Sequence, residues 1–322
     1  MTSNIKVAPG TPTNFAPFLE GQSFTIGSEA FPIHTYSITM MLGILASILT
    51  IAIFWRRARY KWDYLFTLIL ITVPLSIIGS RLWFLVEAAI YSTNFNFANW
   101  YKIWEGGLSI QGGIICAFIA DITYVYSKRH VMDIRKVADI IIPTILIGQV
   151  IGRWGNYANH EVFGKIDLDG SSSFIFGDSF ANNMFIKTAD GTVAYRYPLF
   201  LYESIANFIG YIILVWIINW MGLLKPGSSS SWYFIYYGLV RLAMEPLREE
   251  SYLIYTIAAY LFIIGGTISF IFFQFFNPTH YLKEWRKYRF IYVYAHPEKY
   301  IKWIEKTRFK TKKSHKITEV YS

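Results

Sequence analysis

The amino-acid sequence predicts an all-α, polytopic membrane protein with seven transmembrane helices, an N-terminus outside the cell and a cytoplasmic C-terminus. Three observations lead to this prediction. Of the 322 residues, 54% are hydrophobic and only 16% are charged, whereas a soluble domain has about 25% charged residues. Several apolar runs reach the roughly 17–25 residues that a helix needs to cross a bilayer. The basic residues cluster in alternate connections between these runs.

The apolar runs define the spans in chain order. The run at 33–55 contains no titratable basic residue except His34, and the runs at 204–224 and 251–279 carry no formal charge. Three other spans contain arginine, and one begins with a glycine-rich segment. The predicted spans are residues 33–55, 64–90, 105–126, 138–158, 198–221, 232–248 and 252–276.

The distribution of Lys and Arg predicts the orientation, because cytoplasmic connections are enriched in both. The connections after the first, third and fifth spans, together with the segment after residue 277, contain 21 of these residues, and the opposite side contains 6. The net charge of +9 therefore belongs to a cytoplasmic face next to anionic lipid. It is no indication of a nucleic-acid partner.

Three parts of the chain follow from this topology. Residues 1–32 form an extracytoplasmic, Pro-rich N-terminal segment, and residues 33–276 form the seven-helix transmembrane domain. Its longest outer loop, 159–197, is either a small folded cap or a flexible loop. Residues 277–322 are a basic cytoplasmic tail in which aromatic and basic side chains alternate. This composition favours an interfacial amphipathic helix on anionic lipid, with a specific cytoplasmic partner as the alternative.

The polar residues of the spans share one depth. An arginine inside a span costs about 2.5–3.5 kcal/mol, so it requires a partner or a ligand. In the predicted topology, side chains from six spans meet in the outer half of the bilayer and form a site. Arg241, Glu245 and Arg248 share one helical face by their spacing. The other members are Tyr36, Arg81, Gln111, Arg153, Asn156, Asn159 and Glu203.

Arginines, amides and a tyrosine at headgroup depth suit a lipid that carries a phosphate, because guanidinium groups bind phosphate oxygens in pairs. The sequence contains no phosphate-binding Walker loop, no HExxH motif and no carboxylate cluster with metal spacing, so we predict neither a metal nor a cofactor. The single cysteine, Cys116, lies in an apolar stretch and is interpreted as an inert thiol. Buried ion pairs that only fix helix packing, such as Arg81 with Glu87, are the alternative to a site.

One segment carries a recognisable motif. The residues "GRWGNYANHEVFG" at 152–164 resemble the signature of the prolipoprotein diacylglyceryl transferases, G-R-x-[GA]-N-F-[LIVMF]-N-x-E-x-x-G. Tyr157 replaces the usual Phe, and Ala158 replaces a larger aliphatic residue. Five further blocks agree in order, so the resemblance covers roughly residues 33–276. They are "IHTYSITM", "IIGSRLWF", "EGGLSIQGGII", "YPLFLYES" and "YYGLVRLAMEPLRE".

The resemblance implies an enzyme of the bacterial plasma membrane with its active site toward the outer leaflet. Such an enzyme transfers the diacylglyceryl group of phosphatidylglycerol to the lipobox cysteine of a prolipoprotein signal peptide, and glycerol phosphate leaves. Arg153 and Arg241 are then expected to hold the phosphate. Tyr36, Asn156, Asn159 and Gly164 match essential or binding positions of the family. The remaining charged residues are expected to orient the arginines or extend their network: Arg81, Glu203, Glu245 and Arg248.

Gln111 departs from the family pattern, because many members have a histidine there that is a proposed general base. A glutamine side chain cannot take up a proton. His160 and Glu203 are alternative bases, and the surrounding arginines are a third means of activating the thiol.

Two other functions compete with the transferase. The first is a membrane carrier or channel for an anionic lipid or solute, which would need coupling residues at the bilayer midplane; the sequence has no internal repeat to support it. The second is a membrane scaffold whose loop 159–197 binds a partner.

Overall fold

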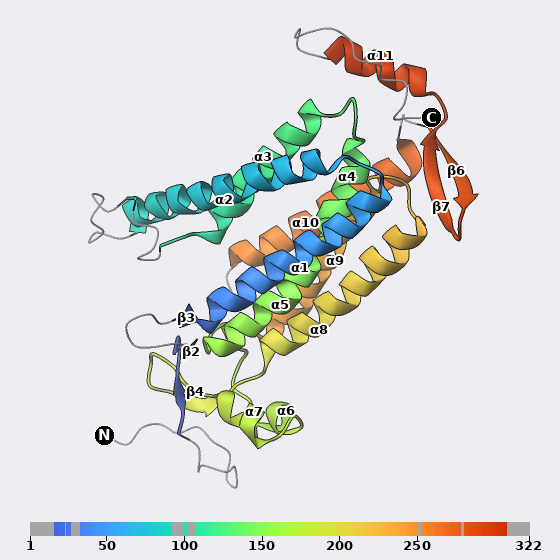
Figure 1. Ribbon diagram of the computed structural model, residues 1–322. Coiled ribbons are helices and arrows are strands. Elements are labelled where there is room, and N and C mark those ends of the chain that lie inside the picture. The colour runs from blue at the N-terminus through green and yellow to red at the C-terminus, as the bar shows by residue number, and fades with distance from the viewer. Residues whose placement is uncertain are drawn as a thin grey trace. The chain divides into compact units, whose positions relative to one another are not determined.

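The computed structural model describes residues 16–22, 24–26, 33–91, 100–101, 107–249, 253–277 and 280–307. It is mostly helical, with short strands near the N-terminus, in the loop 159–197 and in the tail (Figure 1). The chain divides into two compact units. One comprises residues 1–51 and 138–293, and the other comprises residues 52–137 and 294–322.

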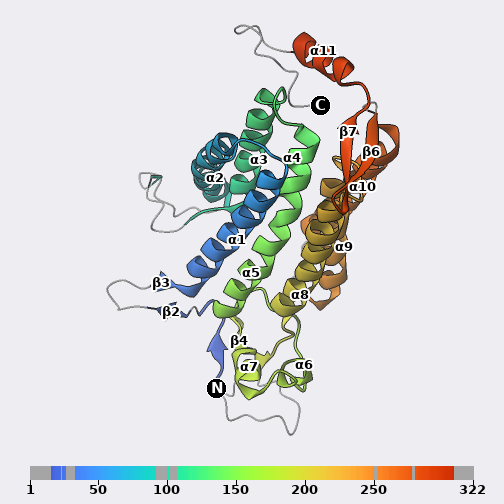
Figure 2. The ribbon, with the colours of Figure 1, turned by 45° about the vertical axis from the view of Figure 1, so that its right-hand side comes forward.

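The first unit contains the longer helical assembly (Figures 1 and 2). Its helical segments are the first part of α1 (Thr35–Arg57), the end of α4 (Ile134–Ile141), η3 (Ile142–Thr144), α5 (Ile145–Ala158), α8 (Leu199–Tyr211), the π-helical η4 (Ile212–Asn219), α9 (Ser228–Met244), η5 (Glu245–Leu247), α10 (Leu253–Ile271) and the π-helical η6 (Phe272–Phe276). Helix α5 packs along α8, and α9 packs along α10.

Glycines permit a close approach of α1 and α5. A Cβ atom built on Gly43 would lie 2.9 Å from the carbonyl oxygen of Gly148. At the other end of α5, a Cβ atom on Gly155 would lie 2.5 Å from the hydroxyl of Thr39 and 2.8 Å from the ring of Tyr36. Small residues at such contacts let helices pack backbone to backbone.

Among the described residues, four helices are long and apolar enough to cross a membrane: Thr35–Arg57, Trp62–Ile90, Leu199–Asn219 and Leu253–Phe276. They coincide with the first, second, fifth and seventh predicted spans. The other three predicted spans also coincide with helical segments, namely α3 (Ile110–Ser127), α4 to α5, and α9 to η5. Seven membrane crossings and the positions of the two termini remain predictions.

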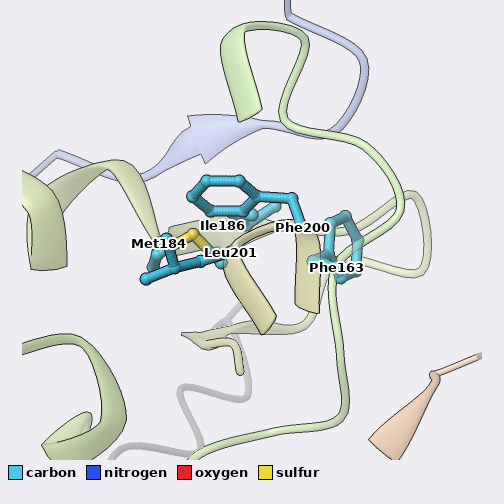
Figure 3. Close-up of a cluster of buried hydrophobic side chains, with 5 residues drawn as sticks. All are labelled: Phe163, Met184, Ile186, Phe200 and Leu201. Atoms are coloured by element: carbon cyan, nitrogen blue, oxygen red, sulfur yellow. The ribbon is translucent and has the colours of Figure 1, made fainter. Parts of the chain in front are cut away.

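The loop 159–197 is folded, and we call it the cap. Strands β4 (Phe185–Lys187) and β5 (Val193–Tyr195) are antiparallel, and β1 (Phe18–Leu19) from the N-terminal segment joins β4 in parallel. The short helices α6 (Ser171–Phe174) and α7 (Asp178–Asn183) complete it. A buried cluster joins the cap to the start of α8 (Figure 3), and its members are Phe163, Met184, Ile186, Phe200 and Leu201. A second pair of strands, β2 (Thr25–Ile26) and β3 (Ile33–His34), precedes α1.

The second unit contains α2 (Trp62–Tyr91) and α3, which pack along each other. A Cβ atom on Gly112 would clash with the carbonyl oxygen of Gly79, so this contact is also made backbone to backbone. Helix α11 (Pro297–Thr307) belongs to the same unit. The guanidinium of Arg129 donates to the carbonyl oxygen of Thr307 at 2.8 Å and thereby caps the C-terminal end of α11.

The described part of the tail holds more than the predicted helix. It begins with a hairpin of β6 (Tyr281–Arg286) and β7 (Arg289–Tyr294), and residues 297–307 are helical. Two turn residues, Lys287 and Tyr288, have φ values of 44° and 65°, and two-residue hairpin turns of the favoured type require positive φ at both positions. The alternating aromatic residues of β7 therefore follow the two-residue period of a strand.

Candidate active site

Glu203 on α8 lies at the centre of the candidate site. Its side chain is 3% exposed. One carboxylate oxygen accepts a hydrogen bond from Arg248 at 2.5 Å, and the other pairs with Arg153 on α5. A buried carboxylate is stable only when it is paired and hydrogen-bonded, so the two arginines supply the partners of Glu203 and Glu203 fixes both guanidinium groups.

Arg241 and Glu245 extend this group from the end of α9. Their nearest charged atoms are 3.9 Å apart, and the Nε atom of Arg248 is also 3.9 Å from Glu245. The guanidinium of Arg241 lies 5.2 Å from the ring centre of Tyr255 on α10, a cation–π geometry. Both oxygens of Glu245 are buried without a hydrogen-bond partner in the described part of the chain. Arg241 and Glu245 therefore keep hydrogen-bonding capacity for a ligand.

Asn156 connects Arg153 to the segment after α5. Its amide nitrogen donates to Glu161 at 2.9 Å, and its oxygen lies 3.4 Å from a guanidinium nitrogen of Arg153. Tyr36 on α1 interacts electrostatically with both Glu161 and Arg153. The side-chain oxygen of Asn159, which follows the last turn of α5, is buried without a hydrogen-bond partner among the described residues. The side chains of Asn156, Asn159 and Tyr36 therefore lie at or near the predicted phosphate-binding segment.

The backbone after α5 adopts conformations that few residues tolerate. His160 and Val162 have φ values of 48° and 55°, and for a β-branched residue such as Val162 this region is a strained outlier that costs about 1–3 kcal/mol. Gly164 is required by space: a Cβ atom there would lie 2.7 Å from the Cβ of Tyr197 and 2.8 Å from the carbonyl oxygen of Leu247. Strain of this kind persists where the surroundings fix the chain, as at a binding site.

Tyr157 stands where the family has phenylalanine, and both its ring and its hydroxyl make contacts. The ring stacks on Phe200 with centres 4.6 Å apart, and the hydroxyl accepts a hydrogen bond from Asn183 of the cap at 2.7 Å. The substitution therefore adds a polar link between α5 and α7 to the packing that a phenylalanine would provide.

His160, one of the alternative bases, is 2% exposed. It stacks on Phe18 with ring centres 4.4 Å apart, and its Nδ1 lies 2.6 Å from the carbonyl oxygen of Gln22. These contacts attach the N-terminal segment to the signature loop, which gives His160 a packing role.

Arg81 and Gln111 belong to the second unit. Arg81 donates from Nε to the carbonyl oxygen of Trp100 at 2.8 Å and from a terminal nitrogen to that of Gly107 at 2.9 Å. The side-chain oxygen of Gln111 accepts from the hydroxyl of Ser109 at 2.6 Å, and this hydroxyl also lies 3.3 Å from Glu87. Arg81 thus orders the segment that leads into α3.

The first unit contains nine of the eleven candidate residues, and eight of them are connected by hydrogen bonds, ion pairs, a backbone bridge or electrostatic interactions. Arg248 interacts electrostatically with Glu203, Arg241, Arg153 and Glu245. The three guanidinium groups can bind an anion such as a phosphate. The connected residues are Tyr36, Arg153, Asn156, Gly164, Glu203, Arg241, Glu245 and Arg248, and Asn159 lies beside them at the end of α5.

Two contributions were missed at the level of sequence. Glu161 is a fixed position of the signature, so its hydrogen bond to Asn156 could have been anticipated. Tyr255 lies in an uncharged apolar run, and no pattern in that run distinguishes the ring that faces Arg241.

Comparisons with known proteins identify the family of this chain. A family model described as prolipoprotein diacylglyceryl transferase matches residues 23–277. A phosphatidylglycerol–prolipoprotein diacylglyceryl transferase of Mycoplasmopsis pulmonis is 51% identical over 287 residues, which cover 87% of this chain and 88% of the relative. Proteins of the same name from Mycoplasmoides gallisepticum and Streptococcus uberis are 33% and 35% identical; the alignments cover 80% and 69% of this chain and 78% and 81% of the relatives. The chain belongs to the prolipoprotein diacylglyceryl transferase family.

Proposed function

We propose that this chain transfers the diacylglyceryl group of phosphatidylglycerol to the lipobox cysteine of prolipoprotein signal peptides and releases glycerol phosphate. One observation carries the proposal: the buried carboxylate of Glu203 holds Arg153 and Arg248 together, next to Arg241. The names of the relatives, which specify phosphatidylglycerol and prolipoprotein, support it.

In the proposed reaction, the cysteine sulfur forms a bond to the terminal glycerol carbon of the diacylglyceryl group. The bond from this carbon to the phosphate oxygen breaks, and the electron pair leaves with glycerol phosphate. The negative charge on the leaving phosphate therefore increases in the transition state. Arg153 and Arg241 are positioned to stabilise that charge, and stabilisation of developing charge often contributes more to catalysis than any other effect.

The thiol must lose its proton before or during this step. Because Glu203 is engaged by two guanidinium groups, we assign it an orienting role and not that of a base. The positive charge of the arginines would lower the pKa of an approaching thiol and favour the thiolate. Asn156, Asn159 and Tyr36 would provide hydrogen bonds to the lipid headgroup, and Gly164 would keep the backbone close to it. Arg81 and Gln111 belong to the second unit, and their part in the reaction stays a prediction from the resemblance.

We also propose that the protein crosses the bacterial plasma membrane seven times, with the N-terminus outside, the C-terminus in the cytoplasm and the site toward the outer leaflet. The excess of Lys and Arg in alternate connections supports this orientation. The basic tail would contact anionic lipid through Lys283, Arg286 and Lys287, which are all exposed in the hairpin.

The test uses purified protein, phosphatidylglycerol vesicles and a synthetic lipobox peptide, with mass spectrometry of the peptide. We expect the peptide to gain the mass of one diacylglyceryl group. The gain should disappear with Arg241→Ala and with a peptide in which serine replaces the cysteine. Glu298→Ala, at an exposed position beside His296, is the control and should retain activity. No mass gain from the folded wild-type protein would refute the proposal and leave a lipid carrier as the function to test.

A further inference from the structure

Arg196 is a charged side chain inside the cap, directly after β5. It is 1% exposed, and its Nε atom is buried without a hydrogen-bond partner in the described residues. Its guanidinium group forms an ion pair of 2.7 Å with Glu249 and lies 5.2 Å from the ring centre of Phe163. A buried guanidinium requires a counter-charge, so Glu249 is held at this position by the cap.

The backbone next to this ion pair forms a small three-segment layer. Gly164 donates to the carbonyl oxygen of Tyr197 at 3.0 Å, and Tyr197 donates to that of Lys165 at 3.1 Å. On its other edge, Lys165 donates to the carbonyl oxygen of Leu247 at 2.8 Å. Gly164 also forms a bridge with Arg248. The segment 247–249 therefore adds to the cap as a further edge.

Arg248 lies between these two attachments. Its backbone is held by Gly164, the following residue is held by Arg196, and its side chain binds Glu203 at 2.5 Å. Glu203 in turn pairs with Arg153. A continuous set of contacts thus runs from the interior of the cap to the guanidinium that faces the proposed phosphate.

We propose that Arg196 is a positioning residue for the transfer reaction, which acts through Glu249 to hold Arg248, and through Arg248 and Glu203 to hold Arg153. This inference rests on the proposed function. It gives the cap a role in the reaction, since the cap carries one end of the connection that orients the arginines. Orientation of a charge toward the leaving phosphate affects the transition state more than the bound substrate.

Two variants break the connection at different points, Arg196→Met and Glu249→Gln. The side chain of Glu249 is 38% exposed, so its substitution should disturb folding less than that of the buried Arg196. With kcat normalised to folded protein, we expect each to lower kcat about tenfold or more, with KM for phosphatidylglycerol within about threefold of wild type. Arg196→Lys keeps a positive charge and should recover part of the loss. The double variant should be no worse than the poorer single variant, because both changes remove the same contact. Glu298→Gln, which changes an exposed carboxylate beside His296, should behave as wild type.

Hydrogen–deuterium exchange provides a readout that does not depend on catalysis. Glu249→Gln should raise exchange in segments 164–167 and 247–249 and leave the interior of α10 unchanged. Unchanged exchange in both segments, or wild-type kcat in folded Glu249→Gln, would overturn the role of Arg196. If wild-type protein gives no transfer, the proposed function fails, and the exchange result alone still decides whether Arg196 holds Arg248. If Arg196→Met fails to fold, Glu249→Gln decides the question.

Discussion

Glu203 supplies one carboxylate to two arginine side chains, so its charge should matter more than its size. Glu203→Gln keeps the shape but leaves Arg153 and Arg248 facing each other without a counter-charge. Removing one partner of a buried ion pair costs about 3–5 kcal/mol, and the cost should be lower here because Arg153 is 23% exposed. We expect a clear decrease in melting temperature and loss of transfer activity.

The lipid should modify this loss of stability. In nanodiscs that contain phosphatidylglycerol, the net negative headgroup can replace the missing charge, so the decrease in melting temperature should be smaller than in nanodiscs of zwitterionic phosphatidylcholine. Glu284→Gln, at an exposed ion pair with Arg286, should change neither value. Equal decreases for Glu203→Gln in both lipids would contradict preferential binding of phosphatidylglycerol beside Arg153.

Single residues of the site were predictable where a motif fixes their identity. Arg153, Asn156 and Gly164 follow from the signature. The prediction that Arg241, Glu245 and Arg248 share one helical face was wrong for Arg248, because α9 ends at Met244 and Arg248 lies beyond η5 with an extended backbone. Arg248 joins the group through Glu203. The positive φ of Val162 could not be predicted, because a β-branched side chain gives no local preference for that conformation. It results from the contacts that fix the chain on both sides.

At the level of elements, the sequence left open whether residues 159–197 fold. The answer depends on contacts between distant residues, since the cluster of Phe163, Met184, Ile186, Phe200 and Leu201 has no regular spacing. Strand β1 adds an edge from a segment that the resemblance did not cover. Because this packing is not periodic, a prediction from hydrophobic periodicity had no signal for it.

The turn between β4 and β5 should make the cap sensitive to acid. Hydrogen bonds from the Thr188 hydroxyl, and then from the backbone and hydroxyl of Thr192, lower the pKa of Asp190 from 3.8 to about 2. A lowered pKa in the folded state stabilises the turn above about pH 4, and this contribution is lost as the pH falls toward 2. Cleavage of the cap by an acid protease should therefore increase through this range.

Asp190→Asn removes the titrating group. This variant should be cleaved faster than wild type at about pH 4, and its cleavage should depend less on pH down to about 2. Asp178→Asn, on α7 of the same cap, should retain the wild-type profile. Parallel profiles for wild type and Asp190→Asn would show that the turn does not control access to the cap.

The hairpin of the tail predicts a lipid contact at its tip. Tyr288 is 87% exposed and Trp285 is 57% exposed, and Arg286 and Lys287 are adjacent. Exposed aromatic and basic side chains near the end of an apolar helix are typical of the headgroup region. A polarity-sensitive fluorophore on Tyr288→Cys, in a Cys116→Ser background, should emit at shorter wavelength in phosphatidylglycerol nanodiscs than in phosphatidylcholine nanodiscs. The same probe on Glu298→Cys should not distinguish the lipids, and identical emission from Tyr288→Cys in both would exclude a charge-dependent contact.

At the scale of the whole molecule, the positions of the helices were more predictable than the number of crossings. All seven predicted spans coincide with helical segments, but four of the described helices meet the criteria of length and hydropathy. Two of the others contain features that lower those measures without preventing a helix. The segment α4 to α5 is interrupted by η3 at Pro143, and α9 begins with four buried serines. Hydroxyls of Ser230 and Ser231 donate to the carbonyl oxygen of Gly227, so these polar groups are satisfied inside the protein.

The orientation can be tested with two cysteines in the Cys116→Ser background. Ala189→Cys places an exposed thiol in the cap, and Tyr288→Cys places one at the tip of the hairpin. With an odd number of crossings between the cap and the tail, these positions lie on opposite sides of the membrane. An impermeant maleimide should label Ala189→Cys in spheroplasts and Tyr288→Cys in inverted vesicles. Labelling of both cysteines from the same side would require an even number of crossings between the cap and the tail. Labelling with the sides exchanged would place the proposed site toward the cytoplasmic leaflet. The basic residues after the first, third and fifth spans favour an outer cap and a cytoplasmic tail, because moving these residues across the bilayer during insertion is costly.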